Sequence, residues 1–234
     1  MTEPVRKLKL LIVVTAVVIV CAVIVCGHRI AGAANTPAHE RVGYELPFGA
    51  KPFAPSNAQT TTGDFINQSD FIPASRCASC HKQTHAEWSE SAHRNAFREP
   101  FYQANVNHLI KERNIAATRH CESCHNPVAL FSGALSMNAK SARPFDEEGV
   151  SCSVCHSIVS TTTDGIGSYT IEPPALLVRE NGERLSDAND EEILSDLPSH
   201  SRAMMRPLLK KPEFCAACHK SAIVPELNGQ CCKN

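Results

Sequence analysis

Aromatic side chains are scarce in this chain: one Trp, three Tyr and nine Phe make up 6% of 234 residues. Methionine occurs four times, and the formal net charge is only −1, with 23 Lys and Arg against 24 Asp and Glu. A balanced charge gives no support for nucleic-acid binding, which is associated with an excess of basic residues. The few aromatic residues indicate that the polypeptide alone has little material for a core, so another apolar group must supply part of it.

Cysteine and histidine, in contrast, follow a pattern. The sequence Cys-x-x-Cys-His occurs four times, beginning at Cys77, Cys121, Cys152 and Cys215, and these copies are called motifs 1 to 4 in chain order. On one helical turn, positions i, i+3 and i+4 share a face. Two thiols so placed can add to the vinyl groups of one porphyrin while the imidazole reaches its iron. This spacing is typical of covalent c-type haem attachment.

The motifs therefore predict four covalently bound haem c groups, and we expect these haems to form much of the core and the fold to depend on them. The predicted thioether cysteines are Cys77, Cys80, Cys121, Cys124, Cys152, Cys155, Cys215 and Cys218. The predicted proximal iron ligands are His81, His125, His156 and His219.

Paired Cys-x-x-Cys units also build zinc ribbons, in which four thiolates hold one tetrahedral metal ion. A zinc ribbon does not need a histidine after each pair. Because histidine fills only 11 of 234 positions, four trailing histidines are not expected by chance. Redox-active dithiols give no reason for that histidine either. The pattern thus favours haem over zinc.

Seven further histidines are available for the far side of each iron. His28 and His39 lie in the N-terminal region and are poor candidates, and we expect His108 to lie at the surface. The candidate distal ligands are His93, His120, His200 and His85. Met204, Met205 and Met137 are the only methionine candidates beyond the first residue. Since methionine ligation raises the haem potential, a set dominated by histidine predicts low potentials.

The N-terminal sequence predicts a membrane anchor or a signal sequence. A basic flank at residues 1–9 precedes an uncharged run from Leu10 to Cys26, which is 17 residues long and at the lower limit for a membrane span. We expect residues 10–27 to form a transmembrane anchor in the inner membrane, with the chain beyond it in the periplasm. The alternative is a signal sequence cleaved near Ala31-Gly32-Ala33, which would release the protein into the periplasm.

Beyond this run, residues 28–75 are rich in Pro and Gly and predict a tether, which either extends freely or packs on the haem domain through its phenylalanines. Residues 76–225 are the predicted tetrahaem domain and 226–234 a tail. The expected fold is mainly α and haem-cored, with little regular sheet. Expected elements are helices at 77–97, 100–113 and 199–211, a short strand pair within 167–185, and a helix or loop at 187–196.

The stretch from Cys77 to His93, CASCHKQTHAEWSESAH, resembles the opening of the multihaem cytochromes related to cytochrome c-554. In that family a Cys-x-x-Cys-His is followed by a Trp and a Ser-x-His element, matched here by Trp88, Ser91 and His93. The resemblance covers about residues 72–225 and depends mostly on the haem motifs after the first segment. It implies closely stacked haems, a mainly helical fold, electron transfer, and His93 as a distal ligand. Some family members leave one haem five-coordinate.

These features predict an electron-transfer protein more than an enzyme. Its partners would be other redox proteins or quinol-oxidising complexes of the inner membrane, with no nucleic acid. One alternative is an enzyme acting on a small nitrogen compound (nitrite, hydroxylamine or nitric oxide), which needs one haem iron with an open position and proton donors beside it. Another is a structural role in which copies of the chain stack their haems end to end.

Overall fold

The structure is a computed structural model that describes residues 51–135, 143 and 145–220. The expected anchor at 10–27 and the expected tail at 226–234 lie outside the described residues. Within the described ranges, no helix is long and apolar enough to cross a membrane.

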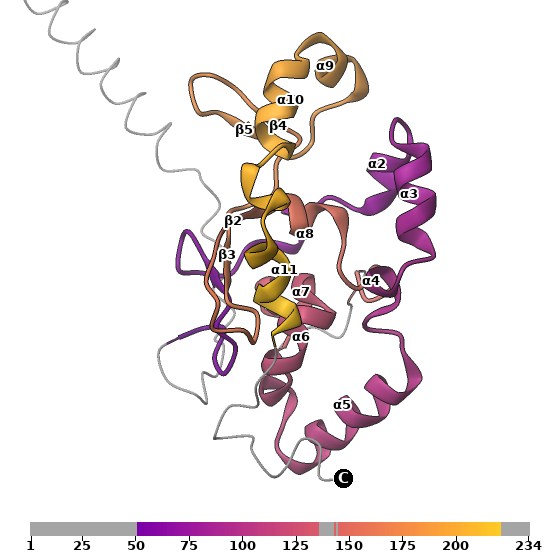
Figure 1. The fold of residues 1–234 in the computed structure, drawn as a ribbon, viewed down its shortest axis with the longest axis vertical. Coiled ribbons are helices and arrows are strands. Elements are labelled where there is room, and N and C mark those ends of the chain that lie inside the picture. The colour runs from indigo at the N-terminus through magenta and orange to yellow at the C-terminus, as the bar shows by residue number, and fades with distance from the viewer. Residues whose placement is uncertain (1–50, 136–142, 144, 221–234) are drawn as a thin grey trace, which may run out of the picture. The chain divides into compact units, whose positions relative to one another are not determined.

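Short helices account for about half of the described residues (Figure 1). The α-helices are α2 (Ala74–Ala78), α3 (Lys82–Ser89), α4 (Ala92–Asn95), α5 (Pro100–Glu112), α6 (Arg119–His125), α7 (Pro127–Phe131), α8 (Cys152–Ser157), α9 (Asp190–Ser195), α10 (Leu197–Met204) and α11 (Pro212–His219). Three 3-10 turns complete the helical part: η1 (Gln68–Asp70), η2 (Ile115–Thr118) and η3 (Pro207–Lys210). The prediction of a mainly α protein is confirmed.

Within the residues that the structure describes, regular sheet is limited to two small units. Strand β3 (Tyr169–Ile171) lies between β1 (Gln59–Thr60), to which it is parallel, and β2 (Ile158–Thr161), to which it is antiparallel. Strands β4 (Leu177–Val178) and β5 (Arg184–Leu185) form an antiparallel pair. The strands expected within 167–185 are therefore present, but Tyr169–Ile171 and Leu177–Val178 do not pair with each other: β3 pairs with β1 and β2, and β4 pairs with β5.

Helix boundaries follow local capping chemistry. The prediction for 100–113 is confirmed by α5, which has Pro100 in its first turn and the Glu99 carboxylate accepting the Tyr102 backbone N–H at 2.7 Å. The single helix expected over 77–97 is wrong: the chain leaves the helical conformation at His81 and again at Ser91, whose hydroxyl caps α4. The helix expected to reach 211 ends at Met204.

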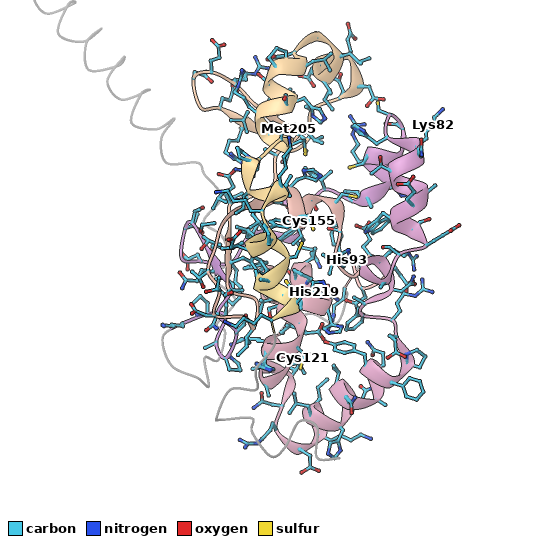
Figure 2. The ribbon with its side chains drawn as sticks, viewed as in Figure 1. Lys82, His93, Cys121, Cys155, Met205 and His219 are labelled. Carbon is cyan, nitrogen blue, oxygen red and sulfur yellow. The ribbon has the colours of Figure 1, made fainter. Side chains whose placement is uncertain are left out.

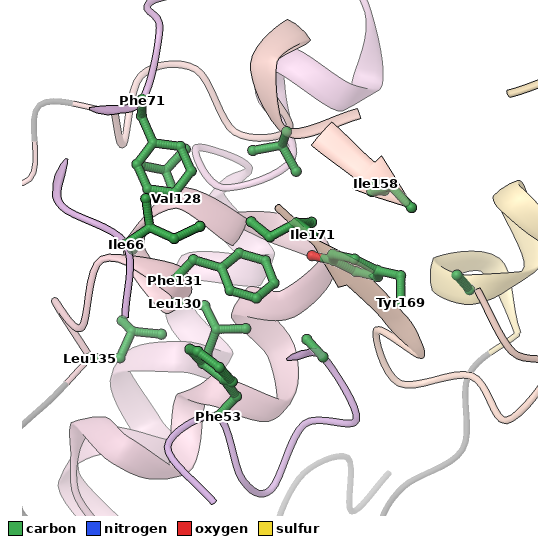
Figure 3. Packing of buried hydrophobic residues seen from close by; sticks show 14 residues of the cluster. Phe53, Ile66, Phe71, Val128, Leu130, Phe131, Leu135, Ile158, Tyr169 and Ile171 are labelled. Atoms are coloured by element: carbon green, nitrogen blue, oxygen red, sulfur yellow. The ribbon is translucent and has the colours of Figure 1, made fainter. Parts of the chain in front are cut away.

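Apolar residues from distant segments meet in one main core (Figure 3). Phe131 of α7 is fully buried, with its ring centre 5.2 Å from that of Phe53 and 5.7 Å from that of Tyr169. Phe65 and Phe71 belong to the same core. Residues 51–75 thus pack against the haem-motif domain, which is the packed alternative for this part of the predicted tether. Aromatic residues are few, but they are concentrated here.

Candidate haem sites

All four motifs lie at short helices. Motif 1 begins in α2 and ends at His81 before α3, motif 2 lies in α6, motif 3 in α8 and motif 4 in α11. In motif 1 the backbone N–H groups of Cys80 and His81 both donate to the Cys77 carbonyl, at 3.3 and 2.9 Å, so the three residues form one turn. All eight motif cysteines are free of disulfide bonds. Each motif therefore has the local geometry that haem attachment needs.

Tertiary contacts hold motif 1 next to motif 3. The Glu148 carboxylate, just before motif 3, accepts the Ala74 N–H at the start of α2 through both oxygens, at 3.0 and 3.1 Å. The anionic group thereby satisfies a free donor of the first helical turn. Burial raises the pKa of the Glu148 carboxyl, whereas this hydrogen bond lowers it. The bond connects two motifs that are distant in sequence.

Cysteine contacts place the four motifs in a series. The neighbouring thiols are Cys77 with Cys152, Cys155 with Cys215, and Cys218 with Cys124. The first and last of these pairs are hydrogen bonded, and Cys155 and Cys215 are close enough to interact electrostatically. In the chain without haem, burial raises the pKa of the Cys155 thiol to about 11. The spatial order is motif 1, motif 3, motif 4, motif 2, which differs from the order in sequence.

Two of the motif histidines face a second imidazole. The ring centres of His81 and His200 are 6.3 Å apart with an angle of 24° between the rings, and those of His93 and His219 are 6.0 Å apart at 59°. Figure 2 shows the second pair side by side. Metal–imidazole bonds of about 2 Å on both sides of one iron, plus the offset from each nitrogen to its ring centre, give a separation of roughly 6 Å. Both pairs fit that arrangement.

Hydrogen bonds to backbone carbonyls orient three of the histidines. The Nδ1 atoms of His125, His156 and His200 lie 2.8, 2.7 and 2.7 Å from the carbonyl oxygens of Ala96, Met204 and Leu176. A carbonyl only accepts, so each Nδ1 carries the proton and Nε2 keeps its lone pair for a metal. Such partners are typical of iron- and zinc-binding imidazoles. His200 shares this feature with two motif histidines, His125 and His156.

A cavity of about 590 Å³ adjoins motifs 1 and 3. Its lining includes the four imidazoles of His81, His85, His156 and His200. Three apolar side chains on its wall are exposed in the chain alone, with exposed fractions of 65% for Leu194, 55% for Leu197 and 63% for Met205. Exposed apolar residues around a concave site indicate an apolar ligand. The residues present therefore fit a porphyrin held by motif 1.

The remaining candidate histidines occupy different surroundings. His85 lines the cavity with His156, and its ring lies 5.4 Å from that of Trp88. The Nδ1 atom of His120 is buried without a hydrogen-bond partner, and burial lowers the pKa of this imidazole. His108 is exposed on α5. Among the described residues, no second histidine ring comes as close to His125 or His156 as in the two pairs above.

The surroundings of motif 2 contain polar groups that the spacing of the motifs did not indicate. Glu122 is fully buried between the two motif cysteines, and burial raises the pKa of its carboxyl to about 8. Arg143 lies 4.0 Å from Glu122 and donates to Asp146 at 2.8 Å. The ring of Tyr102 lies flat against the imidazole of His125, with ring centres 3.9 Å apart. An acidic residue inside Cys-x-x-Cys was the one available sign of such a site.

Residues 76–157, which contain motifs 1 to 3, match the family described as cytochrome c554 and c-prime. No match was found among curated proteins or among solved structures. Motif 4 lies outside the matched segment but has the same sequence pattern and a short helix of its own. Residues 76–157 are thus similar to this cytochrome family, and the Cys-x-x-Cys-His motifs that they contain are candidate sites for covalently bound haem.

Proposed function

We propose that this chain is a membrane-anchored periplasmic tetrahaem cytochrome that transfers electrons between redox partners. The main supporting observation is that cysteines of different motifs lie next to each other, in the order motif 1, motif 3, motif 4, motif 2. Because each cysteine is a point of haem attachment, adjacent cysteines bring the attached edges of successive haems together. Covalently bound haem supplies reversible one-electron chemistry at each motif.

The distal ligands follow from the ring geometry. His200 would hold the far side of the motif 1 haem opposite His81, and His93 that of the motif 4 haem opposite His219. His85 is the candidate for motif 3, because it shares a cavity wall with His156. His120 is left as the candidate near motif 2. Axial imidazoles without methionine support low potentials.

The location rests on the N-terminal sequence. The basic flank at 1–9 and the apolar run at 10–27 favour an inner-membrane anchor with the haem domain in the periplasm. A quinol-oxidising membrane complex and a periplasmic redox protein are the partner classes that suit this position. Motifs 1 and 2 stand at the two ends of the series, so electrons would enter near one of them and leave near the other.

A second candidate function is favoured by the surroundings of motif 2. Among the described residues, no second imidazole faces His125 in the manner of the two pairs, and Glu122, Tyr102 and Arg143 cluster beside it. An iron with an open position is what a small-molecule reductase or oxidase needs, and a buried carboxyl and a phenol lie near its expected His125 ligand. In this alternative the chain acts on a small nitrogen compound at motif 2.

One set of spectra separates the two functions. The purified protein is analysed for haem per chain, for EPR signals in the oxidised state, and for carbon monoxide binding after reduction. Four low-spin haems that ignore carbon monoxide support the electron carrier. One high-spin haem that binds carbon monoxide and nitrite supports the enzyme. A colourless protein containing zinc would contradict both.

A further inference from the structure

The imidazole of His125 is in contact with an aromatic ring. The rings of Tyr102 and His125 are nearly parallel, at an angle of 5°, and their centres are 3.9 Å apart. Two flat rings at this distance are in van der Waals contact over their faces. Among the described ring pairs, this is the closest and the most nearly parallel. The stack therefore opposes rotation of the imidazole about its bond to the rest of the side chain.

The same short segment also fixes the edge of this imidazole. The Ala96 carbonyl accepts a hydrogen bond from His125 Nδ1 at 2.8 Å, and Ala96 precedes Tyr102 by less than two helical turns. The hydrogen bond opposes rotation of the imidazole within its own plane, and the stack with Tyr102 opposes tilting of that plane. We call residues 96–102 the clamp segment. Both restraints on a motif 2 ligand originate in this segment, which follows motif 1.

Tyr102 is itself held in place. Its backbone N–H is bonded to the Glu99 carboxylate at the start of α5, at 2.7 Å. Its ring meets the Phe97 ring edge-on, with centres 6.2 Å apart, and the guanidinium carbon of Arg143 lies 4.9 Å above the Phe97 ring. The Tyr102 hydroxyl oxygen is buried. A side chain packed on this many sides has little freedom to follow a moving imidazole.

We propose that Tyr102 is a positioning residue that sets the plane of the His125 imidazole through this stack, and thereby tunes the motif 2 haem. The inference rests on the proposed haem attachment at motif 2. The orientation of an axial imidazole and its hydrogen bonding are among the levers by which a protein tunes a bound metal. Tyr102 acts through His125 and does not itself bind iron.

The test compares two substitutions at position 102 in the full-length holoprotein. Tyr102→Leu removes the flat ring but keeps an apolar side chain, and Tyr102→Phe keeps the ring but removes the hydroxyl. The matched control is Phe101→Leu, at the neighbouring residue of α5, whose side chain is 81% exposed. Haem per chain, EPR spectra and a spectroscopic redox titration are recorded for each variant.

In Tyr102→Leu we expect the EPR signal of one haem to shift and broaden, because the imidazole then samples several orientations. The midpoint potential of that haem should shift with it, while the other haems keep their signals. Tyr102→Phe and Phe101→Leu should match the wild type. If Tyr102→Leu lowers the haem content, Tyr102→Ile provides the same comparison with another aliphatic side chain that cannot bind iron.

Two results would overturn the inference. Fully loaded Tyr102→Leu or Tyr102→Ile with unchanged signals would show that the stack does not set the imidazole plane. Equal shifts in Tyr102→Phe and Tyr102→Leu would assign the effect to the hydroxyl instead. The proposed function fails differently: peptide mass analysis of the wild type would then find no haem on Cys121 and Cys124.

Discussion

The imidazoles of His81 and His200 face each other with ring centres 6.3 Å apart. His81 belongs to motif 1 and His200 to α10, more than 100 residues later in the sequence. Two tertiary contacts hold α10 at this site. His200 Nδ1 donates to the Leu176 carbonyl at 2.7 Å, and the Met204 carbonyl accepts from His156 Nδ1 at the same distance. A helix that carries a candidate ligand for motif 1 thus also orients the histidine of motif 3.

Replacing His200 should open one axial position. In His200→Ala we expect one haem to change from low-spin to high-spin and to bind carbon monoxide after reduction, because among the described residues the His200 ring is the imidazole that faces His81. His93→Ala should do the same at motif 4. His108→Ala is the matched control, since His108 is exposed, and its spectra should equal those of the wild type. Low-spin spectra in both test variants would contradict the ligand assignment.

Removing the cysteines of motif 4 tests the haem count. The double variant Cys215→Ala, Cys218→Ala should carry one haem fewer per chain than the wild type, because a haem without thioether bonds is lost under denaturing conditions. Absorbance of the denatured, reduced haem and the intact mass measure this directly. The control is the double variant Cys231→Ser, Cys232→Ser, which leaves all four Cys-x-x-Cys-His motifs intact and should carry as many haems per chain as the wild type.

Glu148 should contribute to stability through its bond to α2. Glu148→Ala leaves the Ala74 N–H without its partner and should lower the free energy of unfolding by about 1–2 kcal/mol. The matched control is Glu147→Ala, at the neighbouring residue, whose side chain is 70% exposed and forms ion pairs with Arg94 and Arg98. That control should change the free energy by less than about 0.5 kcal/mol. Chemical denaturation followed by circular dichroism measures both, and equal values would contradict the capping role.

The aromatic core should be sensitive to loss of volume. Phe131→Ala removes a fully buried ring from contact with Phe53 and Tyr169 and should lower the free energy of unfolding by about 3–5 kcal/mol. Phe101→Ala removes an exposed ring and should have an effect within about 0.5 kcal/mol. A small effect of Phe131→Ala would indicate that the haems, and not this polypeptide core, provide most of the stability.

The sequence predicted the local features of the haem sites better than the way in which distant segments come together around them. The motifs, the capped start of α5 and the mainly helical fold all depend on residues close together in the chain, and local spacing and capping rules describe such features well. The breaks at His81 and Ser91 and the pairing of β3 with β1 and β2 were not predicted. The break at Ser91 depends on a local cap, its hydroxyl accepting the Arg94 N–H, which helical periodicity does not reveal. The pairing of β3 with β1 depends instead on contact between distant segments.

The candidate distal ligands illustrate the same division. The sequence offered four candidate distal ligands, His93, His120, His200 and His85. The structure places His200 and His93 opposite a motif histidine and His85 in the cavity beside His156. The count alone gave no motif to any of them. Tyr102 and Arg143 went unnoticed because neither belongs to a motif, and only the fold places them near His125 and Glu122.

The sequence by itself determined the four candidate sites of haem attachment, because the covalent chemistry of that attachment needs only five consecutive residues on one helical turn. The tertiary structure decided the spatial order of the motifs, the imidazoles that face each other, and the tyrosine that stacks on His125. These relationships arise when helices from all parts of the chain pack around shared sites, so they depend on long-range contacts that no local sequence pattern specifies.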